Sequence, residues 1–309
     1  MTKVLNPVPP SGLAPPLTLL LLILLPVLCN ACGDSREGTP GEGRAPDTFA
    51  APGRLRATVE ILAADSMVGR LTGTRGAAMA ADYVALELEG LGLEPAFPTG
   101  FLQPVPLARV VHEDGLEGLV LGDEEALPGL MVLERFADVN VGALLRGRQR
   151  DMEEELVVLC SHFDALGLDP LPGGGGSDGS GALVVPAVAA MLEAARALTL
   201  EGPGDRTILF LFTMGGEEGE LGARWYLRHP VLPLERTVAA IQLEGVGHSA
   251  LFATEGVPAQ TLSLPGGAWG EGAGAGSGDP SAYLHLARVS EALAAAARRA
   301  ANGGTFRDP

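Results

Sequence analysis

The 309-residue sequence is poor in cysteine and in basic residues, and each scarcity excludes a class of protein. Three cysteines, two of them close together near the N-terminus, are too few for a small fold held together by disulfides. The 21 Lys and Arg residues face 38 Asp and Glu residues, which gives a formal net charge of −17. Because phosphate binding needs a basic surface, this balance argues against a nucleic-acid partner. A wholly disordered chain is also excluded, since 47% of the residues are hydrophobic.

Several common catalytic motifs are missing as well. The sequence has no Gly-Lys-Ser/Thr and therefore no phosphate-binding loop of that kind, and it has no His-Glu-x-x-His. Residues 174–179 formally match both a dinucleotide-binding fingerprint and a serine-hydrolase elbow. Both motifs require a strand directly before them, whereas the preceding apolar run ends near Ser161. We therefore set both interpretations aside.

The N-terminus carries a short apolar run, residues 17–28, followed by Cys32. The run is too short to span a bilayer comfortably and is typical of the core of a signal peptide. A small residue directly before Cys32 resembles a bacterial lipobox, and the alternative is ordinary cleavage after Ala31. We predict a signal peptide over 1–31 and an exported protein. A lipid on Cys32 would anchor this protein in the bacterial cell envelope. A periplasmic or extracellular protein is the alternative.

The rest of the chain predicts one folded domain. Residues 32–53 are rich in Gly, Pro and charge, as flexible linkers are. From there, buried strands alternate with helices, which predicts a three-layer α/β/α sandwich with a mostly parallel mixed central sheet over 54–303 and a tail at 304–309. The predicted helices are 54–66, 77–91, 182–198, 220–228 and 283–301. The predicted strands are 105–111, as an edge strand, short strands within 113–135, 156–161, 208–214, 238–243 and 260–264.

Polar residues follow the predicted central strands. They comprise one histidine and several carboxylates: His162, Asp164, Asp178, Glu217, Glu218 and Glu244. In a parallel sheet the working site lies beyond the carboxyl ends of the strands, so these side chains are expected to converge. A cluster of carboxylates is unfavourable unless a cation compensates it. Imidazole and carboxylate together are a usual zinc ligand set, and a further carboxylate can take a proton from metal-bound water.

Four motifs in this order resemble those of the zinc exopeptidases of the aminopeptidase and glutamate carboxypeptidase type, peptidase family M twenty-eight. The family has an His-x-Asp after a strand, a Gly-rich turn with an Asp, a Gly-Glu-Glu stretch, and an acid after a later strand. Here these are similar to residues 162–167, 176–181, 216–223 and 242–244. Residues 64–76 and 140–142 also resemble family segments.

This resemblance implies an enzyme that hydrolyses terminal bonds of a peptide substrate with one or two Zn²⁺ ions. Glu217 would be the general base, and Asp164 would orient His162. The metal ligands would be His162, Asp178, Glu218 and Glu244, and His248 is a further candidate ligand.

The chain also departs from the family pattern. Asp178 stands one residue closer to the following Ser than is usual, and the Glu pair is similarly shifted, so that Gly216 and Glu217 take the base and ligand positions if no gap is allowed. The family's late histidine has no clear counterpart, and the C-terminal part is shortened. The alternative is therefore a degenerate member, similar to nicalin, that acts as a binding or scaffold protein. The sequence does not predict the oligomeric state.

Overall fold

The computed structural model describes residues 50–64, 67, 71–123, 127–164, 180–244, 251–264 and 279–304, with residues 180–183 and 244 described by their backbone alone. The chain divides into two units, Met1–Arg44 and Ala45–Pro309, and every described residue belongs to the second. The predicted signal peptide, Cys32 and nearly all of the predicted linker thus lie outside the described residues, as do Asp178 and His248.

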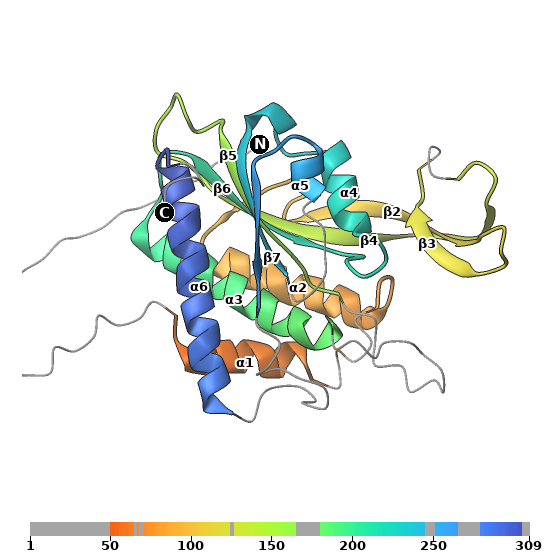
Figure 1. Ribbon diagram of the computed structural model, residues 1–309, viewed down its shortest axis with the longest axis horizontal. Coiled ribbons are helices and arrows are strands. Elements are labelled where there is room, and N and C mark those ends of the chain that lie inside the picture. The colour runs from red at the N-terminus through yellow and green to blue at the C-terminus, as the bar shows by residue number, and fades with distance from the viewer. Residues whose placement is uncertain are drawn as a thin grey trace, which may run out of the picture. The chain divides into compact units, whose positions relative to one another are not determined.

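An eight-stranded mixed sheet forms the centre of the second unit (Figure 1). Its strands run in the order β3-β2-β4-β6-β5-β7-β8, and β1 pairs with β4 beside this path. Neighbouring strands are parallel within the group β6, β5, β7 and β8. Among β1 to β4, the paired strands are antiparallel. Their bounds are Glu94–Pro95 (β1), Leu102–Val111 (β2), Glu117–Leu121 (β3), Met131–Leu145 (β4), Leu156–His162 (β5), Thr207–Thr213 (β6), Thr237–Glu244 (β7) and Ala259–Ser263 (β8).

Helices cover both faces of the sheet (Figure 1). One face packs against α1 (Pro52–Leu62), α2 (Arg75–Gly90), α3 (Ser180–Glu201) and α6 (Pro280–Ala301), and the other packs against α4 (Leu221–Arg228) and α5 (Leu251–Thr254). A short 3₁₀ turn, η2 (Leu234–Arg236), leads into β7. Within the described part of the chain, no helix is long and apolar enough to cross a membrane.

The central strands form where they do because their side chains are apolar on both faces. Every residue of β5 and β6 is buried, which requires cover from both helical layers. Val157 and Leu159 of β5 point into the larger core, and Val158 and Cys160 point into the smaller core under α4 and α5. This alternation matches the two-residue period of a strand.

The predicted fold class, an α/β/α sandwich with a mixed central sheet, is confirmed, but the sheet is parallel only among β6, β5, β7 and β8 and antiparallel in its other half. The sheet is covered on both faces, and the predicted helices and strands match observed ones within a few residues. The ambiguous stretch 113–135 contains β3 and the start of the long strand β4. One expectation was wrong: residues 105–111 belong to β2, which lies between β3 and β4 rather than at the edge. One edge of the sheet is β3, which is one of the short strands predicted within 113–135.

Candidate active site

Asp164 is the most strongly anchored acidic side chain near the end of β5. It is 1% exposed, and its Oδ2 accepts hydrogen bonds from the Gly215 amide at 2.5 Å and from the Thr72 hydroxyl at 2.7 Å. Its Oδ1 accepts a hydrogen bond from the Gly216 amide at 3.1 Å. Burial, reinforced by the charge of Glu218, raises the pKa of Asp164 to about 7. Asp164 therefore joins the end of β5 to the loop that follows β6.

Thr72 connects Asp164 to Glu218. Its hydroxyl oxygen lies 2.7 Å from Oδ2 of Asp164 and 3.0 Å from Oε2 of Glu218, and the side chain is buried. A hydroxyl has one proton and can donate to only one of the two carboxylates at a time. A proton on the other carboxyl group lets it donate back to the Thr72 oxygen, in keeping with the raised pKa of both acids. For Glu218 the largest cause of the raised pKa is again burial.

Gly216 brings the same loop against the imidazole of His162. A Cβ atom placed on Gly216 would lie 2.4 Å from Cγ of His162, closer than any real contact. Only glycine therefore allows this approach without displacing the ring. His162 is the last residue of β5, is 8% exposed, and lies one residue before Phe163 and two before Asp164.

Asn140, within β4, holds this loop from the other side. Its Oδ1 accepts from the Met214 amide at 3.2 Å, and its Nδ2 donates to the Gly222 carbonyl at 2.9 Å. Nδ2 also lies 2.9 Å from Oε1 of Gln103. The side chain is fully buried, and a Cβ atom on Gly222 would lie 2.2 Å from its Oδ1. The loop between β6 and α4 is therefore fixed at both ends.

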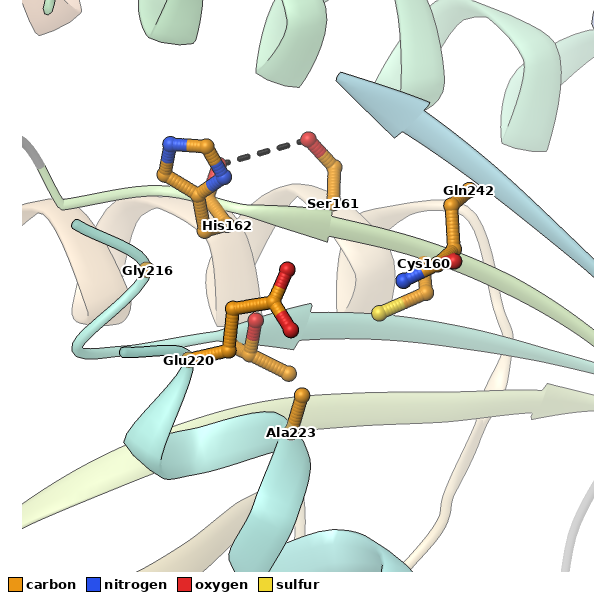
Figure 2. A pocket seen from close by; sticks show the side chains of 8 residues that line it. Cys160, Ser161, His162, Gly216, Glu220, Ala223 and Gln242 are labelled. Carbon is orange, nitrogen blue, oxygen red and sulfur yellow. Dashed lines mark hydrogen bonds between the residues drawn. The ribbon is translucent and has the colours of Figure 1, made fainter. Parts of the chain in front are cut away.

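A small pocket opens beside His162, between the parallel strands and α4 (Figure 2). It has room for about one water-sized group. Figure 2 shows that strand β5 contributes Cys160, Ser161 and His162, and that the carboxylate of Glu220 extends toward this strand. Burial raises the pKa of Glu220. The complete lining is Cys160, Ser161, His162, Thr213, Gly216, Glu220, Ala223 and Gln242.

The structure brings part of the predicted site together. His162, Asp164 and Glu218 meet around the loop after β6, and Glu217 lies half-buried on the same turn. Glu244 ends β7, the strand that pairs with β5, and its side chain lies outside the described residues. Asp178 and His248 lie outside them too. In the part of the chain that is described, no group of three or more His, Cys, Asp or Glu side chains is placed to hold a metal ion.

Sequence reasoning missed Thr72, Glu220 and Gln242 as site residues. Thr72 lies 92 residues before Asp164 and 146 before Glu218, so no local pattern connects it with them. Glu220 and Gln242 fall inside stretches that carry the family motifs, but neither occupies a recognised position. The signal available for Glu220 was a third acidic residue directly before the first residue of α4, Leu221.

A comparison with models of known protein families finds a match for the segment that contains these residues. Residues 140–261 match the model of peptidase family M28. The resemblance predicted from the four motifs is therefore confirmed, and the matched segment contains His162, Asp164, the Glu pair and Glu244. Comparison with curated proteins gives no significant match.

Solved structures share the fold of the chain. An aminopeptidase from Aneurinibacillus sp. strain AM-1 superposes with a TM-score of 0.59 at 12% identity, covering 84% of this chain and 97% of that one. A glutaminyl cyclase from Porphyromonas gingivalis gives a TM-score of 0.52 at 14% identity, covering 80% and 97%. The zinc aminopeptidase BSAP from Bacillus subtilis gives 0.50 at 13% identity, covering 82% and 96%. At such identities the likeness concerns the fold alone.

Proposed function

We propose that the chain is a zinc-dependent exopeptidase of the aminopeptidase type that hydrolyses terminal bonds of peptides. The observation that carries this proposal is the convergence of His162, Asp164 and Glu218 around the loop after β6, within the segment that matches peptidase family M28. The aminopeptidases among the proteins of like fold agree with it.

The described side chains do not make a complete zinc site by themselves. They include His162 and Glu218, whose imidazole and carboxylate are suitable donors, but no described group of three such side chains is placed around one point. The other proposed ligands are Asp178, Glu244 and His248. When bound, zinc would supply a water molecule activated for attack on a peptide carbonyl.

The roles of the described residues follow from their contacts. Through the amides of Gly215 and Gly216, Asp164 holds the loop after β6 in place, and Gly216 in turn contacts the His162 ring. Asp164 therefore fixes the position of the imidazole relative to the Glu pair. We propose that Glu217, which lies on this loop, accepts the proton from the attacking water.

The variant Glu217→Gln tests this role. It keeps the size of the side chain and removes its basicity, so turnover of an amino-acid p-nitroanilide is expected to fall by about 10²-fold or more. Zinc content, measured by mass spectrometry, is expected to stay the same. Glu235→Gln, at an exposed position in η2, is the matched control. Full activity of Glu217→Gln would reject the assignment.

A second candidate is a binding protein that keeps the fold without peptidase activity. The observation that favours it is the lining of the pocket beside His162, to which the loop after β6 contributes Gly216 and Glu220 rather than the Glu pair. Tightly bound zinc together with peptidase turnover would exclude this candidate. A purified chain that binds peptides without cleaving them, even with zinc present, would favour it.

A further inference from the structure

The turn before α2, residues 71–74, is held by carboxylates from two parts of the sheet. Asp138, on β4, accepts a hydrogen bond at Oδ2 from the Gly73 amide at 2.6 Å. Asp164, which follows β5, accepts a hydrogen bond from the Thr72 hydroxyl at 2.7 Å. Because Thr72 and Gly73 are neighbours in the chain, the two carboxylates together fix one turn.

Gly73 can lie this close to β4 because it has no side chain. Its φ is 80°, a conformation without steric cost for glycine. A Cβ atom placed on it would lie 2.5 Å from Cε2 of Phe136, which precedes Asp138 by two residues on the same strand. Strand β4 therefore positions the turn with a ring and with a carboxylate.

Asp138 is a buried acid outside the predicted ligand set. Its side chain is on a residue that is 7% exposed, and both of its oxygens accept hydrogen bonds from backbone amides. The second amide is that of its neighbour Val139, at 2.8 Å from Oδ1. An asparagine has a single acceptor oxygen and could not accept both bonds. Since burial of a carboxylate is costly, these bonds are the compensation that the structure provides for Asp138.

The same turn carries the hydroxyl that meets Glu218. The oxygen of this hydroxyl, on Thr72, lies 3.0 Å from Oε2 of Glu218. Burial is the main cause of the raised pKa of Glu218, and the charges of Glu217 and Asp138 add to it, so Asp138 lies near this carboxylate. The hydrogen bonds of the described residues connect Asp138 with Glu218 through Gly73 and Thr72.

We propose that Asp138 is a positioning residue for Glu218: by holding the Gly73 amide, it places the Thr72 hydroxyl where it fixes the Glu218 carboxylate. This inference rests on the proposed function, in which Glu218 is a zinc ligand, and it adds a residue of β4 to the support of that ligand. Loss of a group that orients a metal ligand typically lowers metal affinity by about 10- to 100-fold. The inference therefore predicts weaker zinc binding when Asp138 can no longer accept the amide.

The zinc affinity of the full-length protein, measured by competition with a chelating indicator, tests the inference without relying on turnover. Asp138→Val suits a strand but has no acceptor, so it is expected to weaken zinc binding by about tenfold or more. Asp138→Asn keeps one acceptor oxygen and is expected to lose less. An unchanged affinity in Asp138→Val would overturn the proposal. Equal losses in the two variants would also overturn it, because the charge alone would then be responsible.

Two controls separate positioning from general effects. Asp151→Val makes the same chemical change at an exposed position. Val110→Ala removes methyl groups from a fully buried position on β2 and is expected to lower the melting temperature. Both controls are expected to bind zinc as the wild type does. A loss of zinc affinity in Val110→Ala as large as in Asp138→Val would attribute the effect to stability and overturn the proposal.

The route through Thr72 predicts a non-additive effect. In the Thr72→Val background the hydroxyl that Asp138 positions is absent, so the further change Asp138→Val is expected to weaken zinc binding no more. A further loss as large as that seen in the presence of Thr72 would overturn the route.

Hydrogen exchange in the chelator-treated protein tests the same contact without zinc. Mass spectrometry of fragments covering 71–77 is expected to show faster exchange in Asp138→Asn than in the wild type, because a neutral amide oxygen accepts more weakly than a carboxylate, and the fastest exchange in Asp138→Val. Asp138→Asn has nearly the size of the natural residue, so it keeps the test valid if Asp138→Val does not fold.

These outcomes distinguish the inference from the proposed function. Unchanged exchange in the Asp138 variants would overturn the inference whatever the zinc content. A wild type that binds no zinc would reject the proposed function, and faster exchange in the variants would then still support Asp138 as the residue that holds the turn.

Discussion

Thr72 shows how one buried hydroxyl can organise two acids. It comes from the loop before α2, in the stretch 64–76 that resembles a family segment, and it lies between Asp164 and Glu218. Without the shared Thr72 hydroxyl, the carboxylates of Asp164 and Glu218 would face each other in a buried environment, where like charges repel strongly. The loop before α2 thus contributes the hydroxyl of Thr72 to the site.

Replacement of Thr72 tests this role. Thr72→Val preserves the shape and removes the hydroxyl, so the chelator-treated protein is expected to lose about 1–3 kcal/mol of unfolding free energy at neutral pH. Thr72→Ser retains the hydroxyl and is expected to stay closer to the wild type. Urea denaturation followed by circular dichroism measures both. Equal stability of the two variants would show that the hydrogen bonds to Asp164 and Glu218 contribute nothing.

The raised pKa of Asp164 predicts a pH dependence of stability in the metal-free protein. Its folded-state pKa of about 7 is above the ordinary value of 3.8, so the folded state binds the proton more tightly than the unfolded state does. The resulting stabilisation is complete below about pH 4 and is lost as the pH rises through about 7, with a slope of at most about 1.4 kcal/mol per pH unit.

Asp164→Asn removes this titrating group. Urea denaturation of the chelator-treated wild type at several pH values between 4 and 8 is expected to show the decline in stability, and the variant is expected to show a flatter profile over the same range. The absolute stability of the variant does not enter the comparison. An unchanged slope in Asp164→Asn would mean that another group, such as Glu218, causes the decline.

At the scale of elements, the loop between β6 and α4 is the part of the structure on which the site depends. Its backbone is held by Asp164 at Gly215 and Gly216 and by Asn140 at Met214 and Gly222. These contacts join β4, β5 and β6, which are neighbours in the sheet although 140, 164 and 214 are far apart in sequence. A local motif could therefore predict the acidic residues of the loop but not the residues that hold it.

Asn140→Leu tests the contribution of β4. The variant fills a similar volume but leaves the Met214 amide and the Gly222 carbonyl without their buried partners, so it is expected to lose about 2–4 kcal/mol of unfolding free energy. Leu116→Gln, at an exposed position, is the control and should lie within about 0.5 kcal/mol of the wild type. Chemical denaturation measures both, and a loss equal to that of the control would contradict the proposed role of Asn140.

At the scale of the whole molecule, the sequence predicts the fold better than the site. Continuous apolar runs such as 156–161 and 208–214 predict β5 and β6 because strands buried on both faces need them. The order of the strands and the antiparallel half of the sheet depend on pairing between distant segments, which no local pattern shows. The same reason explains why Thr72, which is distant in sequence from Asp164 and Glu218, was missed as a site residue.

The apolar N-terminal run predicts where the protein is located. Export and a lipid on Cys32 remain predictions, because residues 1–49 lie outside the described part of the chain. They agree with a peptidase that meets peptides outside the cytoplasm, and they do not affect the account of the site, which rests on residues of the second unit.

The central claim, a zinc-dependent exopeptidase, is tested most directly by the metal content of the purified protein. The full chain, prepared without chelator and offered zinc, is measured by mass spectrometry after removal of free metal. The account predicts one or two tightly bound zinc ions per chain, with the content reduced by replacement of His162 with Ala. A chain that binds no zinc under these conditions would contradict the account and leave the binding-protein alternative.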